Sequence, residues 1–289
     1  MSRLALGTAQ FGSHYGISNV DGQVDSLSAK AMIDYARFHS VDTIDTAAAY
    51  GNSEEILGEV GIHGLNIVTK LPSIPEDTKE VAVWIKGQVT NSLLRLGETA
   101  IYGLLLHRPE ELLGEKGPEI YQSLQDLREA GHVKKIGVSI YSPDVLVELT
   151  RHYDFDLVQA PLSLIDRRFE ESGWLQRLKK KGTEIHTRST FLQGLLLMNP
   201  LTIPNKFSIW NEIWDKWRDY LRTSKVTSLQ ACLGYPLSLS GVDRVVVGAD
   251  NKEQLKRIIK SEIGGNHYDF PNLGCVDERL INPANWSLL

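Results

Sequence analysis

The stretch DTIDTAAAYGNSEE, residues 42–55, shows most directly how this chain folds. It completes the apolar run VDTID (41–45), which is typical of a strand buried on both faces, and then opens a helix-like segment. Asp45 and Tyr50 stand where the strand gives way to the helix, with three alanines between them. A turn by itself would favour Gly, Asn or Asp at these positions. We therefore expect the small alanine side chains to leave room for a ligand beside the acid and the phenol.

The same change from strand to helix recurs along the whole chain. Eight short runs rich in Val, Ile and Leu are predicted as buried strands of a parallel sheet. They are RLALGT (3–8), VDTID (41–45), NIVTK (66–70), IYGLLLH (101–107), KKIGVS (134–139), FDLVQA (155–160), TEIHTR (183–188) and DRVVVG (243–248). An amphipathic segment follows each of them, the first with Ser28 as its expected N-cap, and no linker intervenes. Eight strand–helix units in about 260 residues predict a TIM (β/α)8 barrel, with residues 1–289 forming one domain.

A doubly wound parallel sheet is the alternative, because the order of strands cannot be taken from one sequence. Its dinucleotide fingerprint would follow the first strand, where the chain has GTAQFGSH (7–14). This segment lacks the G-x-G-x-x-G spacing, and Ser13-His14 stand where a P-loop requires Lys followed by Ser or Thr. The barrel is therefore the preferred interpretation.

The composition excludes several classes of partner. The 289 residues carry a net charge of −5, and the pI of about 5.9 argues against a nucleic-acid footprint, which would be basic. No apolar run approaches the roughly 20 residues of a membrane-spanning helix, and MSRLALGTAQFG (1–12) lacks the features of a signal peptide. Cys232 and Cys275 have no metal-binding spacing. We expect a cytoplasmic protein without a metal ion, as a monomer or a small homo-oligomer.

Polar residues end three consecutive strands of the predicted barrel. Asp45 and Tyr50 follow the second strand, Lys70 ends the third, and His107 ends the fourth. Each has an ordinary explanation by itself, such as capping a turn, packing at the surface or binding a loop carbonyl. However, the carboxyl ends of barrel strands meet at one mouth, which is where the active sites of such barrels lie. The four side chains are therefore expected to lie together.

Together the four residues would allow Tyr50 to act as a proton donor. A tyrosine with a pKa near 10 is a poor acid at neutral pH, but an ammonium group beside it favours the phenolate and lowers that pKa. Asp45 would hold Lys70 in place and keep it charged. His107 would orient a carbonyl oxygen near Tyr50. Such a site protonates a carbonyl oxygen while another group delivers hydride to the carbon.

The sequence around these residues resembles the aldo-keto reductase family. IDTAAAYGNSEEILG (44–58) is similar to the family signature around its Asp and Tyr, VTKL (68–71) to its Lys strand, and LLLHRPE (104–110) to its His strand. The resemblance runs from LGTAQFG (6–12) to VVVGADNKEQL (245–255), nearly the whole chain. It implies a TIM barrel that reduces aldehydes and ketones to alcohols with NADPH. Its catalytic tetrad would be Asp45, Tyr50, Lys70 and His107.

The start of the chain departs from the family pattern. The first strand begins at Arg3, without the N-terminal hairpin that closes the barrel floor in many members. The C-terminal segment 262–289 could cover the floor instead, or the floor could face solvent.

The resemblance also implies residues that bind the cofactor. Main-chain contacts come from the first strand, the nicotinamide carboxamide is bound after the fifth and sixth, and the pyrophosphate loop follows the seventh. The corresponding residues are Gly7, Thr8 and Ala9; Ser139 and Gln159; Gln193, Gly194 and Leu195; and, near the adenosine, Gly248, Asn251 and Gln254. Arg188 stands where many members stack a Tyr on the nicotinamide, and its guanidinium plane can also stack.

The choice between NADPH and NADH depends on the last of these segments. Asp250 and Asn251 stand near positions where members that prefer NADP carry Ser or Thr and Arg. Lys252 and Arg257 could supply charge nearby. NADPH is therefore expected to be preferred by a narrow margin, and NADH is not excluded.

The substrate pocket would draw on loops around the mouth. His14 and Tyr15 follow the first strand, and Tyr141 follows the fifth. The long connection 189–226 carries Trp210 and Trp214, which either form a substrate lid or pack their face onto the barrel. Aromatic walls suit a small carbonyl substrate, a keto-sugar among others.

Two other functions stay open at this point. A lyase could form a Schiff base at Lys70, but that requires a lowered lysine pKa, and Asp45 close by would have the opposite effect. A nucleotide-sensing subunit of the same fold could bind the dinucleotide without turning over a substrate.

Overall fold

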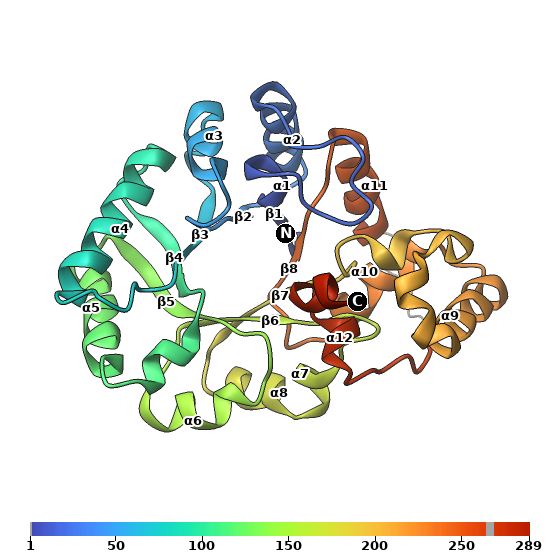
Figure 1. The fold of residues 1–289 in the computed structure, drawn as a ribbon. Coiled ribbons are helices and arrows are strands. Elements are labelled where there is room, and N and C mark those ends of the chain that lie inside the picture. Colours follow the sequence, from blue (N-terminus) through green and yellow to red (C-terminus); the bar gives the residue numbers. More distant parts are fainter. Residues whose placement is uncertain (1, 264–268) are drawn as a thin grey trace.

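The computed structural model describes residues 2–263 and 269–289, and these form a closed parallel barrel ringed by helices (Figure 1). Its strands are β1 (Leu4–Gly7), β2 (Thr43–Asp45), β3 (Asn66–Leu71), β4 (Ile101–Leu106), β5 (Val133–Ser139), β6 (Leu157–Pro161), β7 (Glu184–Arg188) and β8 (Arg244–Val247). Each strand pairs with its neighbours in chain order, and β1 pairs with β8, with Leu4 opposite Val245. This closure confirms the predicted TIM barrel and rules out the doubly wound sheet.

Helices follow the strands and cover the outside of the barrel. They are α1 (Ala9–Gly12), α2 (Ser26–Phe38), α3 (Ser53–Val60), α4 (Val81–Leu96), α5 (Gly117–Glu129), α6 (Val145–His152), α7 (Arg168–Glu171), α8 (Trp174–Lys180), α9 (Asn211–Ser224), α10 (Ser228–Ser238), α11 (Lys252–Ile263) and α12 (Glu278–Ile281). Short 3-10 helices are η1 (Pro109–Leu113), η2 (Leu195–Leu197), η3 (Pro200–Thr202), η4 (Asn205–Trp210) and η5 (Pro283–Leu288). None of the described helices combines the length and apolar character needed to cross a bilayer.

The beginning of α2 differs from the prediction. The N-cap is Asp25 rather than Ser28, and the Asp25 carboxylate accepts a hydrogen bond of 2.9 Å from the Ser28 main-chain N–H. Ser28 is therefore the third residue of the helix. Both residue types are good N-caps, and extended main-chain angles at Asp25 select the earlier one.

The barrel interior is apolar only in a thin layer. Val68, Leu105 and Leu157 form this layer, separate from the larger core between strands and helices. Two residues further along the same strands come Lys70, His107 and Gln159, which face the carboxyl ends of the strands. These polar side chains thus lie above an apolar layer, at the carboxyl ends of the strands. In barrels of this kind the active site lies at that end.

The long connection after β7 packs onto the body of the protein. Trp214 is buried, and its indole N–H donates to the carbonyl of Phe207 at 2.8 Å. Trp210 is also buried and donates to Asp277 at 3.3 Å. Trp217 is 1% exposed. The structure therefore supports the packing alternative for this tryptophan face.

The described part of the C-terminal segment lies at the mouth of the barrel, not at its floor. Figure 1 shows α12 and the C-terminus in front of the β7 and β8 end, and Asn282, Pro283 and Ala284 line the cavity there. Of the two alternatives for the floor, closure by the C-terminal segment does not hold for residues 269–289; residues 264–268 lie outside the described part. At the floor, the Arg3 guanidinium instead donates to main-chain carbonyls at 237, 239 and 242.

Candidate active site

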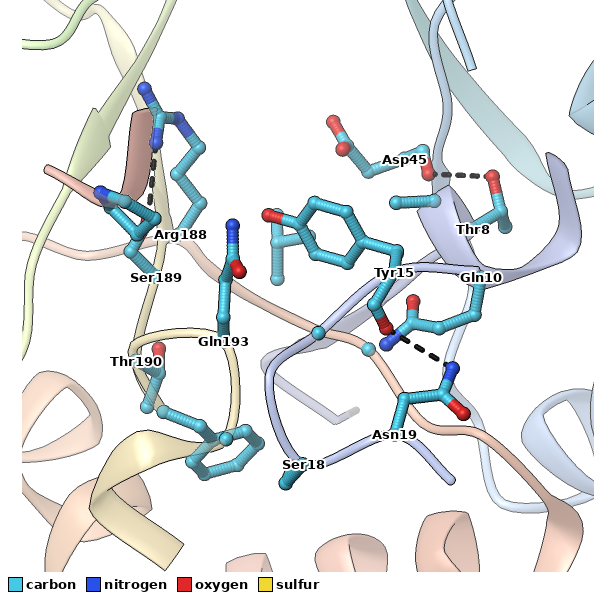
Figure 2. Close-up of a pocket in the computed structure, with 18 of the residues that line it drawn as sticks. Thr8, Gln10, Tyr15, Ser18, Asn19, Asp45, Arg188, Ser189, Thr190 and Gln193 are labelled. Carbon is cyan, nitrogen blue, oxygen red and sulfur yellow. Dashed lines mark hydrogen bonds between the residues drawn. The ribbon is translucent and has the colours of Figure 1, made fainter. Parts of the chain in front are cut away.

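A cavity of about 380 Å³ opens at the carboxyl ends of the strands. It is lined by most of the predicted site residues: Gly7, Thr8, Ala9, Tyr15, Asp45, Tyr50, His107, Tyr141, Arg188, Gln193, Gly194, Gly248 and Gln254. Figure 2 shows Tyr15 in the middle of this cavity, between Thr8 and Asp45 on one side and Gln193 and Arg188 on the other. One cavity therefore joins residues from both ends of the chain.

An ion pair lies beneath the mouth of the cavity. The Lys70 ammonium donates to Asp45 Oδ1 and to the carbonyl of Thr46, both at 2.8 Å, and the Lys70 side chain is 1% exposed. The nitrogen lies 5.1 Å from the centre of the Tyr50 ring. The rings of Tyr50 and His107 meet edge to face, with centroids 6.1 Å apart. The structure thus brings the four polar strand ends together.

The charges of this group are set by burial and by their neighbours. Burial lowers the pKa of Lys70, but Asp45 and Tyr50 beside it outweigh that effect, so the pKa lies above its usual value. Burial, together with the positive charges of Lys70 and Arg188, lowers the pKa of His107 from 6.5 to about 4. At neutral pH the site therefore holds a charged lysine and a neutral imidazole.

Both carboxylate oxygens of Asp45 accept hydrogen bonds, which hold the side chain in place. Oδ1 accepts from Lys70, and Oδ2 accepts from the Gln159 amide at 2.6 Å. The Ser139 hydroxyl donates to the other end of the Gln159 amide at 3.2 Å. Ser139 and Gln159 are buried and do not line the cavity. The sequence predicted that they bind a carboxamide of the cofactor, whereas here their polar atoms are joined to the Asp45 network.

Arg188 lies on the opposite wall, against Tyr141. Its guanidinium group is 4.5 Å from the centre of the Tyr141 ring and donates to the carbonyl of Ile140 at 2.9 Å. Within the described residues it forms no ion pair with a carboxylate. The guanidinium plane is thus held by stacking and by main-chain contact, as a planar stacking partner requires.

Eight predicted residues do not line the cavity: Lys70, Ser139 and Gln159, described above, and Trp210, Trp214, Leu195, His14 and Asn251. Trp210 and Trp214, predicted to contact substrate, are packed against the body of the protein as described above. Leu195 is fully buried. His14 binds the carbonyl of Asn19 at 2.9 Å. Asn251 donates to Asp21 at 3.1 Å and accepts from the main-chain N–H of Gln254 at 3.0 Å, so it links two loops.

The cavity also contains residues that the sequence did not single out. They are Gln10, Gly16, Ser18, Asn19, Ser189, Thr190, Phe191, Leu197, Val246 and the segment 282–284. Most belong to irregular loops, which carry no periodic signal. Gln10 is an exception, since a polar residue three positions after the end of β1 is similar to the signal that marked Asp45, Lys70 and His107. Within the described residues, no cluster of His, Cys, Asp and Glu could hold a metal ion.

A model of the aldo/keto reductase family matches residues 3–263. The chain belongs to this family. Over 282 residues this aldo-keto reductase is 25% identical to the Bacillus subtilis oxidoreductase YqkF, and the match covers 90% of the chain and 91% of the relative. It is 24% identical to the NADH-specific methylglyoxal reductase of Escherichia coli, with 89% and 88% covered.

A solved structure agrees with this assignment at the level of the fold. The holo form of an aldo-keto reductase from Bacillus halodurans superposes on this aldo-keto reductase with a TM-score of 0.74. The sequence identity is 20%, and the superposition covers 92% of this chain and 88% of the other. The two proteins share the barrel architecture.

Proposed function

We propose that the protein is a carbonyl reductase that uses a nicotinamide dinucleotide and takes its proton from Tyr50. One observation carries this proposal: the buried ion pair of Lys70 and Asp45 lies directly beneath the Tyr50 ring. A buried lysine that serves as a structural cation needs its carboxylate, but it needs no phenol. The arrangement is the one required of a tyrosine that acts as a general acid.

Each residue has a part in the proton transfer. The Tyr50 hydroxyl donates its proton to the carbonyl oxygen of the substrate, and the positive charge of Lys70 stabilises the phenolate that this leaves. Asp45 keeps Lys70 charged and in position. The neutral His107 ring can donate a hydrogen bond to the same carbonyl oxygen and so orient it. The bound dinucleotide supplies the hydride that reaches the carbonyl carbon.

The cavity suits a dinucleotide. It extends from Asp45 and Tyr50 to Gln254 and Asp250 at the beginning of α11. Glycines line it on several sides, so the main chain can approach a ligand closely. Gly7, Thr8 and Ala9 would contact the nicotinamide half, Gln193 and Gly194 the pyrophosphate, and Gly248 and Gln254 the adenosine half.

Charge at the far end bears on the choice of cofactor. Asp250 lines the cavity and accepts a hydrogen bond from Gln254 at 3.1 Å. The cations that could offset it point elsewhere: Lys252 lies over the Tyr35 ring at 5.7 Å, and Arg257 donates to the carbonyl of its own helix at 3.4 Å. A 2′-phosphate beside Asp250 would be disfavoured. We therefore propose that any preference for NADPH is narrow and that NADH is used well.

The substrate is proposed to be a small aldehyde or ketone, a keto-sugar among the candidates. Tyr15, Tyr141 and Phe191 provide aromatic surface, and hydroxyl groups and Arg188 provide hydrogen-bond donors. Such walls suit a molecule with both apolar and hydroxylated faces. The lyase alternative is disfavoured, because the pKa of Lys70 is raised rather than lowered.

The test is turnover by the purified protein. NADH and NADPH are each mixed with methylglyoxal, nitrobenzaldehyde or a keto-sugar, and loss of the reduced nicotinamide absorbance is followed along with formation of the alcohol. The proposal predicts steady turnover with at least one substrate. Binding of the dinucleotide without turnover of any substrate would favour the sensing subunit. Trapping of a carbonyl compound on Lys70 by borohydride would favour the lyase.

A further inference from the structure

The Gln10 side chain lies in the wall of the cavity, and the described residues offer its amide no hydrogen-bond partner. Gln10 lies in α1, just after the carboxyl end of β1, and it is 8% exposed. Its side-chain amide lines the cavity and makes no hydrogen bond with any residue in the described part of the chain. Its main-chain carbonyl is used separately, by the N–H of Val24 at 2.9 Å. The amide nitrogen and oxygen are reached from the cavity rather than sealed in the core, so both are available to a ligand.

Gly248, at the end of β8, makes room for this amide. A Cβ atom at position 248 would lie 2.6 Å from Gln10 Nε2 and 2.7 Å from Oε1, closer than real side chains approach. Gly248 has no positive φ, so its backbone conformation does not require glycine. A side chain at position 248 would therefore displace the flexible end of Gln10 from its present position.

Gln10 follows Thr8 by two residues, and its amide lies against Gly248, two residues before Asp250. Figure 2 shows Gln10 on the same side as Thr8, near the main chain of Tyr15 and Asn19. The proposed chemistry is at Asp45 and Tyr50, while Asp250 and Gln254 mark the far end. In a dinucleotide that spans this distance, the middle portion is the pyrophosphate with its two riboses. The amide nitrogen offers two N–H donors to phosphate oxygens, and the amide oxygen can accept from a ribose hydroxyl.

We propose that Gln10 binds the ribose–pyrophosphate portion of the dinucleotide and that Gly248 is needed to keep the Gln10 amide in place. This inference rests on the proposed function, since it needs a dinucleotide in the cavity. Hydrogen bonds to charged groups are stronger than those between neutral groups. Loss of the amide is therefore expected to weaken binding of the dinucleotide about tenfold or more.

The experiment measures dissociation constants of NADH and of ADP-ribose for four proteins: wild type, Gln10→Ala, Gly248→Ala and the double variant. Each single variant is expected to raise both constants about tenfold. The double variant should also show about tenfold, not about a hundredfold, because the two changes remove one interaction. Reduced nicotinamide mononucleotide, which has no pyrophosphate, should lose less affinity than ADP-ribose.

Two matched controls separate this effect from damage to the fold. Gln122→Ala removes an exposed amide on α5, and Gly87→Ala adds a methyl group that meets nothing within 4 Å. Both should bind NADH as the wild type does, and the melting temperatures of all variants are compared. A wild type that binds neither NADH, NADPH nor ADP-ribose contradicts the proposed function itself. A wild type that binds them, with Gln10→Ala within about twofold of it, contradicts only the role of Gln10. A hundredfold loss in the double variant contradicts the link to Gly248.

Discussion

The neutral state of His107 should make the protein less stable in mild acid. The pKa of this imidazole is lowered from 6.5 to about 4 by burial and by the charges of Lys70 and Arg188. In the unfolded chain the ring takes up a proton near pH 6.5, whereas in the folded protein it does so only near pH 4. Between these values the unfolded state binds more protons, so stability is lost as the pH falls through this window.

The size of the effect follows from the two pKa values. Since one pKa unit corresponds to about 1.4 kcal/mol, the full difference amounts to about 3 kcal/mol below pH 4. At about pH 5 roughly 2 kcal/mol has been lost relative to about pH 7.5. The variant His107→Gln keeps a neutral polar side chain and removes the titration.

The assay is urea-induced unfolding of both proteins at the two pH values. The free energy of unfolding of wild type should fall by roughly 2 kcal/mol more than that of His107→Gln between about pH 7.5 and pH 5. Carboxylates titrate in both proteins and cancel in this comparison. His152→Gln removes an exposed imidazole on α6 and should behave as the wild type. Identical pH dependence in wild type and His107→Gln would refute the account of how His107 is held neutral.

Three further changes test other parts of the account. Lys70→Met should lower turnover by roughly 10² or more, with nucleotide affinity retained, because the phenolate of Tyr50 loses its cation; a variant that is folded and within tenfold of wild type contradicts this. Trp214→Ala should lower the free energy of unfolding by about 3–5 kcal/mol and leave KM unchanged, since the indole packs in the core. Altered substrate choice without loss of stability would instead support the alternative that this connection forms a substrate lid. Asp250→Ser should raise the ratio of kcat/KM for NADPH over NADH by about tenfold, and an unchanged ratio would place the 2′-phosphate elsewhere.

The barrel and the polar strand ends could be predicted because they depend on local pattern and simple topology. Apolar runs such as VDTID (41–45) mark strands wherever they lie, and parallel strands that close a barrel bring their carboxyl ends together. Because the strands of the barrel are neighbours in chain order, the ends of β2, β3 and β4 lie side by side. Asp45, Lys70 and His107 therefore lie close together. The family resemblance then pointed to many of the residues that line the cavity.

The sequence predictions that differ from the structure depend on contacts between distant parts of the chain, which the residue type at one position does not reveal. Asp25 and Ser28 are both good caps, and the choice between them depends on where the chain leaves the preceding loop. The path of residues 269–289 is set by packing against η4, where Phe207 meets Trp286 at 4.9 Å between ring centroids. Gln159 could face a ligand or Asp45, and only the geometry shows which partner it has.

The central claim is that Tyr50 supplies the proton to the carbonyl oxygen. The most direct measurement is the single-turnover rate of hydride transfer in Tyr50→Phe, alongside the dissociation constant of the reduced cofactor. The account predicts a rate lowered by roughly 10² to 10⁴, with the dissociation constant nearly unchanged, because the phenol ring remains and only its hydroxyl is lost. A Tyr50→Phe protein that keeps more than about a tenth of the wild-type rate in this assay would contradict the assignment of Tyr50 as the acid.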